Sequence, residues 1–437
     1  MARMVFRIFA KVEMNTFSIR TCPIIFFFFT APVSVCTIVL PNVEIVTLLS
    51  SLLLMLFFSK SIIKIDNYSK HVLLLFFFPI LISTLFACFQ IVLKNDLYYY
   101  EYFQYNLPGR IFHVFSYLLI FTYVHAYLKV DSGIRINILK TYTWGIVLIL
   151  GLFGFWQLLG NFGIWCPDVE TRDSLYFARN LGISRITSIA SEPSYLVPFL
   201  LDGILISVFL RKKVISIFLA IVLLFSLSFG AYMEIIILTF SYFILSTTRQ
   251  RTIFFTIIGI VILIVILMFP EFISLAIEII NSRQELQSGF DVRDTSRTAM
   301  IAYPIMVLFH SDILTIFFGN GPSSFKFLNA SDDDAIFSTS NNIYVDLLYE
   351  GGIVSFLCLI LLAVYFWRLI SSLKVTNSLD KLLVKLFLIH IALSSFYRAD
   401  YASERFTVLL LIVYIFYLIL RQNYAIAHQN RNYKKDD

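Results

Sequence analysis

The sequence is poor in charged residues. Lysine, arginine, aspartate and glutamate make up only 14% of its 437 residues, whereas soluble domains average about 25%. Hydrophobic residues make up 59%, and the mean hydropathy is +0.83. This composition excludes a water-soluble globular fold and indicates a protein that crosses a membrane several times.

Residues that mark other protein classes are scarce as well. The 16 glycines and 11 prolines are too few for a disordered or collagen-like chain. The five cysteines do not form a framework and predict no disulfide. The six histidines lack the spacing of metal ligands, and no glycine-rich phosphate loop or dense basic–aromatic pattern occurs. We therefore expect neither a soluble nucleotide-dependent enzyme nor a nucleic-acid partner.

Long apolar runs fill most of the chain. Because a helix needs about 20 apolar residues to cross a bilayer, these runs predict an all-α polytopic integral membrane protein with about twelve spans, forming one domain over 1–437. The predicted spans are 23–40, 43–59, 71–93, 111–128, 141–162, 193–210, 214–230, 231–247, 252–269, 350–367, 382–397 and 406–420. The first span ends without a small-residue cleavage site, so we expect it to be retained as an anchor.

Lysine and arginine are distributed unequally between the two sides of these spans. The side that holds both termini carries 23 of them, and the other side carries 11. The positive-inside rule therefore predicts that both termini are cytoplasmic. Two long segments, 163–192 and the 80-residue segment 270–349, are then external loops.

The large external loop contains a further apolar stretch, 298–318, which is interrupted by His310, Ser311 and Asp312. If this stretch were a thirteenth span, the basic segment 368–385 would face outward. We therefore predict amphipathic helices that lie on or dip into the outer leaflet. Such a loop is suited to binding a lipid-linked substrate. A receptor or a channel could also contain such a loop.

One candidate site lies at the external start of the sixth predicted span. Pro193 suits the first turn of a helix, and Ser191 or Glu192 can cap it. The free N–H groups of such a helix start can hold a phosphate, and Arg185 lies close upstream. The alternative is an ordinary helix start that Glu192 caps.

A second candidate site is the arginine series Arg283, Arg293 and Arg297 in the large loop. Guanidinium groups can stabilise a departing diphosphate without a metal ion. The alternative is that they solvate the loop or bind lipid headgroups. The carboxylates of 332–334 could recruit a divalent ion, but a solvated acidic run is the stronger expectation.

Polar residues within the apolar runs have a structural and a functional interpretation. Carboxylates in a membrane, here Asp202 and Glu234, are functional candidates by default. We expect Asp202 to act indirectly, by supporting residues that contact the substrate. For His113, His125 and His390 we expect interhelical hydrogen bonds rather than proton relay.

Three elements together resemble the Wzy-type polysaccharide polymerases of the O-antigen polymerase and ligase superfamily. The first element resembles the family's R…EPSY element and consists of Arg185…Ser191-Glu192-Pro193-Ser194-Tyr195. The second resembles its SGR…plfGxG segment and consists of Thr295-Ser296-Arg297 with Phe318-Gly319-Asn320-Gly321-Pro322. The third resembles its HNxYL…E.G segment and consists of Asn341-Asn342-Ile343-Tyr344…Glu350-Gly351-Gly352. They occur in the family's order and cover roughly 180–355.

The resemblance implies a glycosyltransferase of the bacterial inner membrane. The growing glycan on undecaprenyl diphosphate would be transferred to a hydroxyl of a lipid-linked repeat unit at the outer face. Arg185 and Arg297 would bind the diphosphate, and Glu192 would orient or deprotonate the acceptor hydroxyl. Further substrate contacts would come from Arg283, Arg293, Ser194, Tyr195, Asn341, Asn342 and Tyr344.

Two departures from the family pattern affect the choice of function. Asn341 stands where many relatives have histidine, and Ser296 stands where they have glycine. The ligase branch often depends on that histidine, so we favour a polymerase over a ligase. A lipid-linked oligosaccharide flippase is the alternative from another class. The short first external loop, 41–44, leaves no room for an acidic metal motif, so we expect no metal and no cofactor. Membrane lipids, and also a chain-length regulator and a flippase, are the expected partners.

Overall fold

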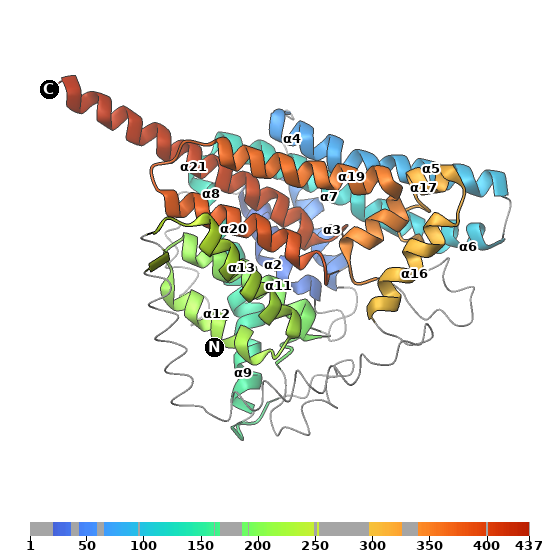
Figure 1. Ribbon diagram of the computed structural model, residues 1–437, viewed down its shortest axis with the longest axis horizontal. Helices are drawn as coiled ribbons and strands as arrows, with labels where there is room; N and C mark the ends of the chain where they lie inside the picture. Colours follow the sequence, from blue (N-terminus) through green and yellow to red (C-terminus); the bar gives the residue numbers. More distant parts are fainter. Residues whose placement is uncertain are drawn as a thin grey trace.

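In the computed structural model, the described residues are 21–35, 43–58, 65–94, 97–160, 162–166, 186–190, 192–248, 251–252, 297–325, 340–398 and 401–436. Within them every regular element is a helix and no strand occurs (Figure 1). The first part of the chain forms α2 (Cys22–Thr30), a 3₁₀ turn (Ala31–Val35), α3 (Val43–Phe58), α4 (Asn67–Val72), a π-helical turn (Leu73–Phe77), α5 (Phe78–Lys94), α6 (Leu97–Tyr105), α7 (Leu107–Val130), α8 (Ser132–Gly145), a second π-helical turn (Ile146–Gly151) and α9 (Leu152–Gly160). The remainder forms α11 (Pro193–Phe209), α12 (Lys213–Phe225), α13 (Phe229–Leu245), α16 (Arg297–Phe309), α17 (Ile313–Phe318), α19 (Ile343–Ser372), α20 (Ser378–Ser394) and α21 (Glu404–Asp436).

Several of these helices have the length and composition of membrane spans. Five are long and apolar enough to cross a bilayer: Asn67–Val92, Leu107–Val130, Ser132–Gly160, Ile343–Ser372 and Glu404–Gln429. Helices overlap eleven of the twelve predicted spans, whereas the predicted span 252–269 lies outside the described residues from 253 onward. The fold is thus that of an all-helical, multi-pass membrane protein.

Contacts between distant helices join segments that the charge distribution assigns to the same side. At one end, Lys129 Nζ lies 3.3 Å from Asp66 Oδ2, and both residues are predicted to be cytoplasmic. At the other end, the Tyr102 hydroxyl donates to the Pro322 carbonyl oxygen at 2.7 Å, and both are predicted to be external. Each of these two contacts thus joins segments that are predicted to lie on the same side. Which end faces the cytoplasm stays a prediction from the positive-inside rule.

The stretch 298–318 forms two helices rather than one span. Helix α16 ends at Phe309, and α17 begins after Asp312. The Asp312 carboxylate accepts from the backbone N–H of Thr315 at 3.0 Å, which caps the start of α17. The polar interruption thus ends one helix and starts the next. That these helices lie at the outer leaflet stays a prediction.

Two glycines let α17 and α19 cross at backbone distance. Gly319 has φ +78° and Gly352 has φ +68°, which is backbone that other residues rarely adopt. A Cβ atom on Gly319 would lie 2.2 Å from the Glu350 carbonyl oxygen, and one on Gly352 would lie 2.2 Å from the Phe317 carbonyl oxygen. No side chain fits between the two segments at this crossing.

The kink at Gly352 also provides acceptors for the loop after α17. The helical pattern is broken there, with φ 68° and ψ −176°. The carbonyl oxygens just before the kink accept from the loop instead: Tyr349 from the Asn320 N–H at 3.1 Å and Glu350 from the Gly321 N–H at 2.8 Å. The second and third family-like elements are therefore joined through their backbones.

Replacing Gly352 with alanine should destabilise this crossing. The dihedral angles at Gly352 are almost specific to glycine, at a cost of about 1–3 kcal/mol for another residue, and the added Cβ would also clash with the Phe317 carbonyl oxygen. We expect a clear fall in the melting temperature of the purified protein. Gly109→Ala is the matched control, because a Cβ there meets no atom within 4 Å. Equal melting temperatures for both variants would contradict the proposed crossing.

Candidate functional site

The starts of α11 and α19 meet at the predicted external end. The Tyr195 hydroxyl donates to Asn341 Oδ1 at 3.0 Å, although the two residues are 146 positions apart. The N–H of Ile343 lies 2.9 Å from the Ser395 carbonyl oxygen and 3.1 Å from that of Arg398. The first and third family-like elements therefore lie against each other and against the connection between α20 and α21.

Glu192 occupies the N-cap position of α11, directly before Pro193. The backbone at Glu192 is extended, as expected of an N-cap, but its side chain makes no capping hydrogen bond. The N–H of Tyr195 is instead taken by the Glu192 carbonyl oxygen at 3.1 Å, and the carboxylate accepts from the Ser194 hydroxyl at 3.0 Å. The prediction that Glu192 starts the helix is confirmed, and the prediction that its carboxylate caps the helix is wrong.

The two asparagines before α19 have different environments. Asn341 has φ 55°, a left-handed conformation that asparagine tolerates better than most residues. Asn342 is buried, and its Oδ1 accepts from the N–H groups of Tyr344 at 2.9 Å and Val345 at 3.4 Å. The Asn342 oxygen therefore caps α19, whereas the Asn341 oxygen connects the helix to Tyr195.

Arg398 is a site residue that the sequence reasoning did not select. Its guanidinium carbon lies 4.8 Å from the centre of the Tyr195 ring and 5.8 Å from that of Phe199. The residue is 8% exposed, so this charge lies within the protein beside the start of α11. The only signal in the sequence was an arginine in a short external connection. We call Glu192, Ser194, Tyr195, Asn341 and Arg398 the helix-start cluster.

Several predicted site residues lie outside the described residues. These are Arg185, Arg283, Arg293 and the acidic run 332–334. Arg297 is the first residue of α16, but its side chain is also outside the described part. The roles predicted for these side chains stay predictions.

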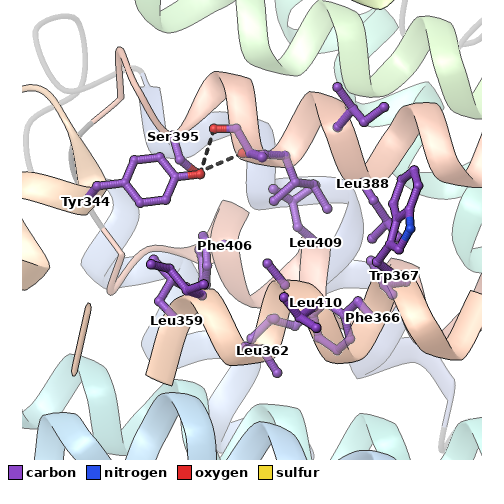
Figure 2. A pocket seen from close by; sticks show the side chains of 17 residues that line it. Tyr344, Leu359, Leu362, Phe366, Trp367, Leu388, Ser395, Phe406, Leu409 and Leu410 are labelled. Carbon is purple, nitrogen blue, oxygen red and sulfur yellow. Dashed lines mark hydrogen bonds between the residues drawn. The ribbon is translucent and has the colours of Figure 1, made fainter. Parts of the chain in front are cut away.

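An apolar groove runs along the bundle beside this end (Figure 2). It has a volume of about 300 Å³ and lies between α19, α20 and α21. Tyr344 and Ser395 lie at one end of the groove, and Trp367 lies toward the other. The Tyr344 hydroxyl donates to the Ala392 carbonyl oxygen at 2.9 Å, which fixes the ring at the mouth of the groove.

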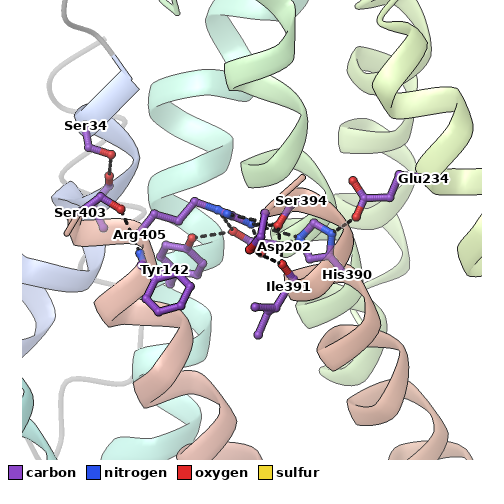
Figure 3. A network of polar contacts seen from close by, with 12 residues as sticks. Ser34, Tyr142, Asp202, Glu234, His390, Ile391, Ser394, Ser403 and Arg405 are labelled. Atoms are coloured by element: carbon purple, nitrogen blue, oxygen red, sulfur yellow. Dashed lines mark hydrogen bonds and ion pairs between the residues drawn. The ribbon is translucent and has the colours of Figure 1, made fainter. Parts of the chain in front are cut away.

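A second group of polar side chains is buried between α8, α11, α13, α20 and α21 (Figure 3). Asp202 accepts from Arg405, with Nε 2.9 Å from Oδ2 and Nη2 3.1 Å from Oδ1. His390 bridges the two carboxylates, with Nε2 2.8 Å from Asp202 Oδ1 and Nδ1 2.5 Å from Glu234 Oε1. The Tyr142 hydroxyl also donates to Asp202 at 2.9 Å. The predicted interhelical hydrogen bonding of His390 is confirmed.

Arg405 corrects one sequence interpretation. The predicted last span starts at residue 406, which leaves Arg405 in the external connection before it. Helix α21 instead begins at Glu404, and Arg405 is only 3% exposed because it pairs with Asp202 on α11. The two residues are 203 positions apart, so no local pattern could predict their pairing.

Acidic, histidine and cysteine side chains do not gather into a metal site in the described part of the chain. Groups of three or more that could hold a metal ion are absent from those residues. The chemistry that the helix-start cluster can offer comes instead from a carboxylate, two hydroxyls, an amide and a guanidinium. This set can bind a sugar hydroxyl and an anion side by side.

Comparison with known proteins provides no family assignment. No protein-family model matches the chain, and no curated protein matches it either.

Proposed function

We propose that the protein is a membrane polysaccharide polymerase. It would transfer a growing glycan from undecaprenyl diphosphate to a lipid-linked repeat unit at the outer face of the bacterial inner membrane. The observation that supports this most is the joining of separate family-like elements at one end of the bundle. Tyr195 contacts Asn341, and Gly319 packs against the backbone at Gly352.

The proposed membrane arrangement has twelve spans with both termini in the cytoplasm. The segments 163–192 and 270–349 are then external loops. The unequal distribution of lysine and arginine supports this orientation, and the same-side contacts between distant helices support the alternation of the spans. The helix-start cluster would then face the compartment in which lipid-linked repeats are joined.

In the proposed reaction the acceptor hydroxyl oxygen forms a bond to the anomeric carbon of the donor sugar. The bond from that carbon to the diphosphate oxygen breaks, the hydroxyl proton passes to the Glu192 carboxylate, and undecaprenyl diphosphate leaves. Ser194, which donates to Glu192 at 3.0 Å, would hold the carboxylate in place. The donor is already activated, so neither a nucleotide sugar nor a cofactor is needed.

Arginines would stabilise the departing diphosphate. Arg185 and Arg297 are the proposed contacts, with Arg283 and Arg293 in support. Arg398 joins this set because the structure places its guanidinium 4.8 Å from the ring of Tyr195. A guanidinium presents two parallel donors to a phosphate, which a point charge does not.

The apolar groove would hold part of the isoprenoid chain of the substrate. Its lining is almost entirely hydrocarbon, and its polar end at Tyr344 and Ser395 adjoins the start of α19. A lipid in the groove would therefore place its polar head near the helix-start cluster. Asn341 in the position of the ligase histidine favours a polymerase over a ligase.

Purified protein should lengthen synthetic lipid-linked repeat units without nucleotide sugar and in the presence of a chelator. Gel analysis would show a ladder of products, because the lipid diphosphate supplies the leaving group and arginines supply the charge. Protein that has been heat-inactivated is the control. Absence of a ladder with every lipid-linked repeat offered, alongside movement of the intact lipid between leaflets, would instead support a flippase. Loss of the ladder in chelator alone, restored by a divalent ion, would contradict metal-independent transfer.

A further inference from the structure

A separate polar cavity lies at the opposite end of the bundle from the helix-start cluster. It has a volume of about 740 Å³ and lies between the starts of α4 and α8, the end of α7, and α19 and α21. The side chains that matter for the argument are Asp66, Lys129, Arg135, Tyr365, Tyr414 and Arg421. We call this space the opposite-end cavity. The proposed polymerase reaction makes no use of it.

The cavity has an excess of positive charge. Its lining includes the cations Lys129, Arg135 and Arg421 and a single carboxylate, Asp66. A second carboxylate, Asp131, is near Arg135 but does not line the cavity, and its Oδ1 caps α8 by accepting from the Gly133 N–H at 2.9 Å. The lining therefore favours an anionic occupant.

Asp66 is already saturated with partners. Its oxygens lie 3.3 Å from Lys129 Nζ and 3.0 Å from His125 Nε2, and they accept from the Tyr414 hydroxyl at 2.8 Å and the Ser69 N–H at 2.9 Å. Burial opposes its ionisation, but the close contact with His125 and the hydrogen bonds from Ser69 and Tyr414 hold the pKa of the carboxyl well below its ordinary value. Asp66 thus neutralises Lys129 and leaves the two arginines.

The two arginines differ in exposure: one is buried in the wall of the cavity and the other lies at its solvent-exposed rim. Arg135 is 8% exposed, and its donors reach only neutral acceptors in the described residues: Nε to the Leu128 carbonyl oxygen at 2.9 Å and Nη1 to Gln422 Oε1 at 2.9 Å. Arg421 lies exposed at the rim, one residue before Gln422. Two guanidinium groups that line one cavity, neither hydrogen-bonded to a carboxylate in the described residues, favour an anionic ligand there.

Aromatic rings form a rigid wall for the cavity. Tyr68 stacks on Tyr414 with ring centres 4.6 Å apart, and His71 stacks on Tyr365 at 4.1 Å. Stacking restricts the motion of these rings, which lowers the entropic cost of binding a ligand against them.

We propose that the opposite-end cavity binds a phosphate group between Arg135 and Arg421. A planar guanidinium group can donate two parallel hydrogen bonds to the oxygens of one phosphate group. The phosphate can belong to an anionic lipid headgroup, since the cavity lies at the end that the charge distribution assigns to the cytoplasmic surface, or to a soluble phosphate ester. The arginines would recognise the phosphate group in the same way in both ligands, and the titrations below distinguish the lipid from the soluble ester.

Binding can be measured by the melting temperature of the purified, delipidated full-length protein in detergent. Four titrations are compared at constant ionic strength: inorganic phosphate, sodium chloride, short-chain phosphatidylglycerol, and a diacylglycerol of equal chain length without phosphate. A rise with phosphatidylglycerol alone identifies a lipid source, and a rise with inorganic phosphate as well identifies a soluble one. No rise with either phosphate compound beyond the chloride and diacylglycerol controls would overturn the proposal.

Arg421→Gln is the diagnostic variant, because its exposed side chain can be changed without disturbing the core. We expect phosphate or phosphatidylglycerol binding to weaken about tenfold or more, as for loss of a charged hydrogen bond. Arg211→Gln removes the same charge at the same end but outside the cavity, where Arg211 forms an exposed ion pair with Asp380, and should bind as the unchanged protein does. Unchanged binding in Arg421→Gln, or equal weakening in both variants, would overturn the assignment.

Discussion

Replacing Arg405 with methionine should lower the free energy of unfolding by about 3–5 kcal/mol, the usual cost of leaving one partner of a buried ion pair alone. Asp202 is completely buried and would lose two guanidinium contacts of 2.9 and 3.1 Å. Among the residues that the structure describes, His390 and Tyr142 would be the remaining partners of its carboxylate. Thermal unfolding in detergent and titration with a denaturing detergent would both measure the loss.

Two comparisons distinguish the loss of the ion pair from general damage. The double variant Asp202→Leu, Arg405→Met removes both charges, so it should recover part of the stability that the single variant loses. Arg211→Met breaks the exposed ion pair with Asp380 and should cost no more than about 1 kcal/mol. If Arg405→Met cost as little as Arg211→Met, the buried network would not hold the helices together as described.

Arg398→Lys should reduce chain elongation by about 100- to 1,000-fold while the amount of protein in the membrane stays normal. Lysine keeps the charge but loses the planar two-donor group and the stacking on Tyr195. Removing one donor that stabilises developing charge typically has an effect of this size. The measurement is the polymer ladder at matched protein level, together with the accumulation of single repeat units.

This expectation rests on the proposed function and has its own controls. Tyr195→Phe removes only the hydroxyl that donates to Asn341, so its effect should be smaller, at about tenfold. Arg211→Lys, at the opposite end, should leave the ladder unchanged. A normal ladder from Arg398→Lys would remove Arg398 from the diphosphate site and would leave Arg185 and Arg297 as the remaining candidates.

Local sequence signals located most of the helices because those signals are themselves local. Apolar run length identified the helices that form α7 and α19, and Pro193 after Glu192 identified the start of α11. Helix boundaries were less certain. The last helix begins at Glu404 rather than 406, because a buried carboxylate on another helix compensates the charge of Arg405.

Contacts between distant residues could not be predicted in the same way. Nothing near Asp202 in the chain indicates that His390 and Arg405 will surround it. Arg398 had no sequence signature, since its position beside Tyr195 depends on how the connection between α20 and α21 folds back. Glu192 was correctly placed at the helix start, but its side-chain partner, Ser194, came only from the structure.

The sequence by itself determined that this is a helical membrane protein, which end of each span is more basic, and which short segments resemble a polymerase. These features follow from transfer of apolar side chains into lipid and from backbone preferences near proline and glycine, which act within a few residues. Only the tertiary structure decided that Tyr195 meets Asn341, that Gly319 meets the kink at Gly352, and that an arginine-lined cavity lies at the opposite end. Those arrangements depend on packing between helices far apart in the chain, where the cost of burying each polar group selects its partner.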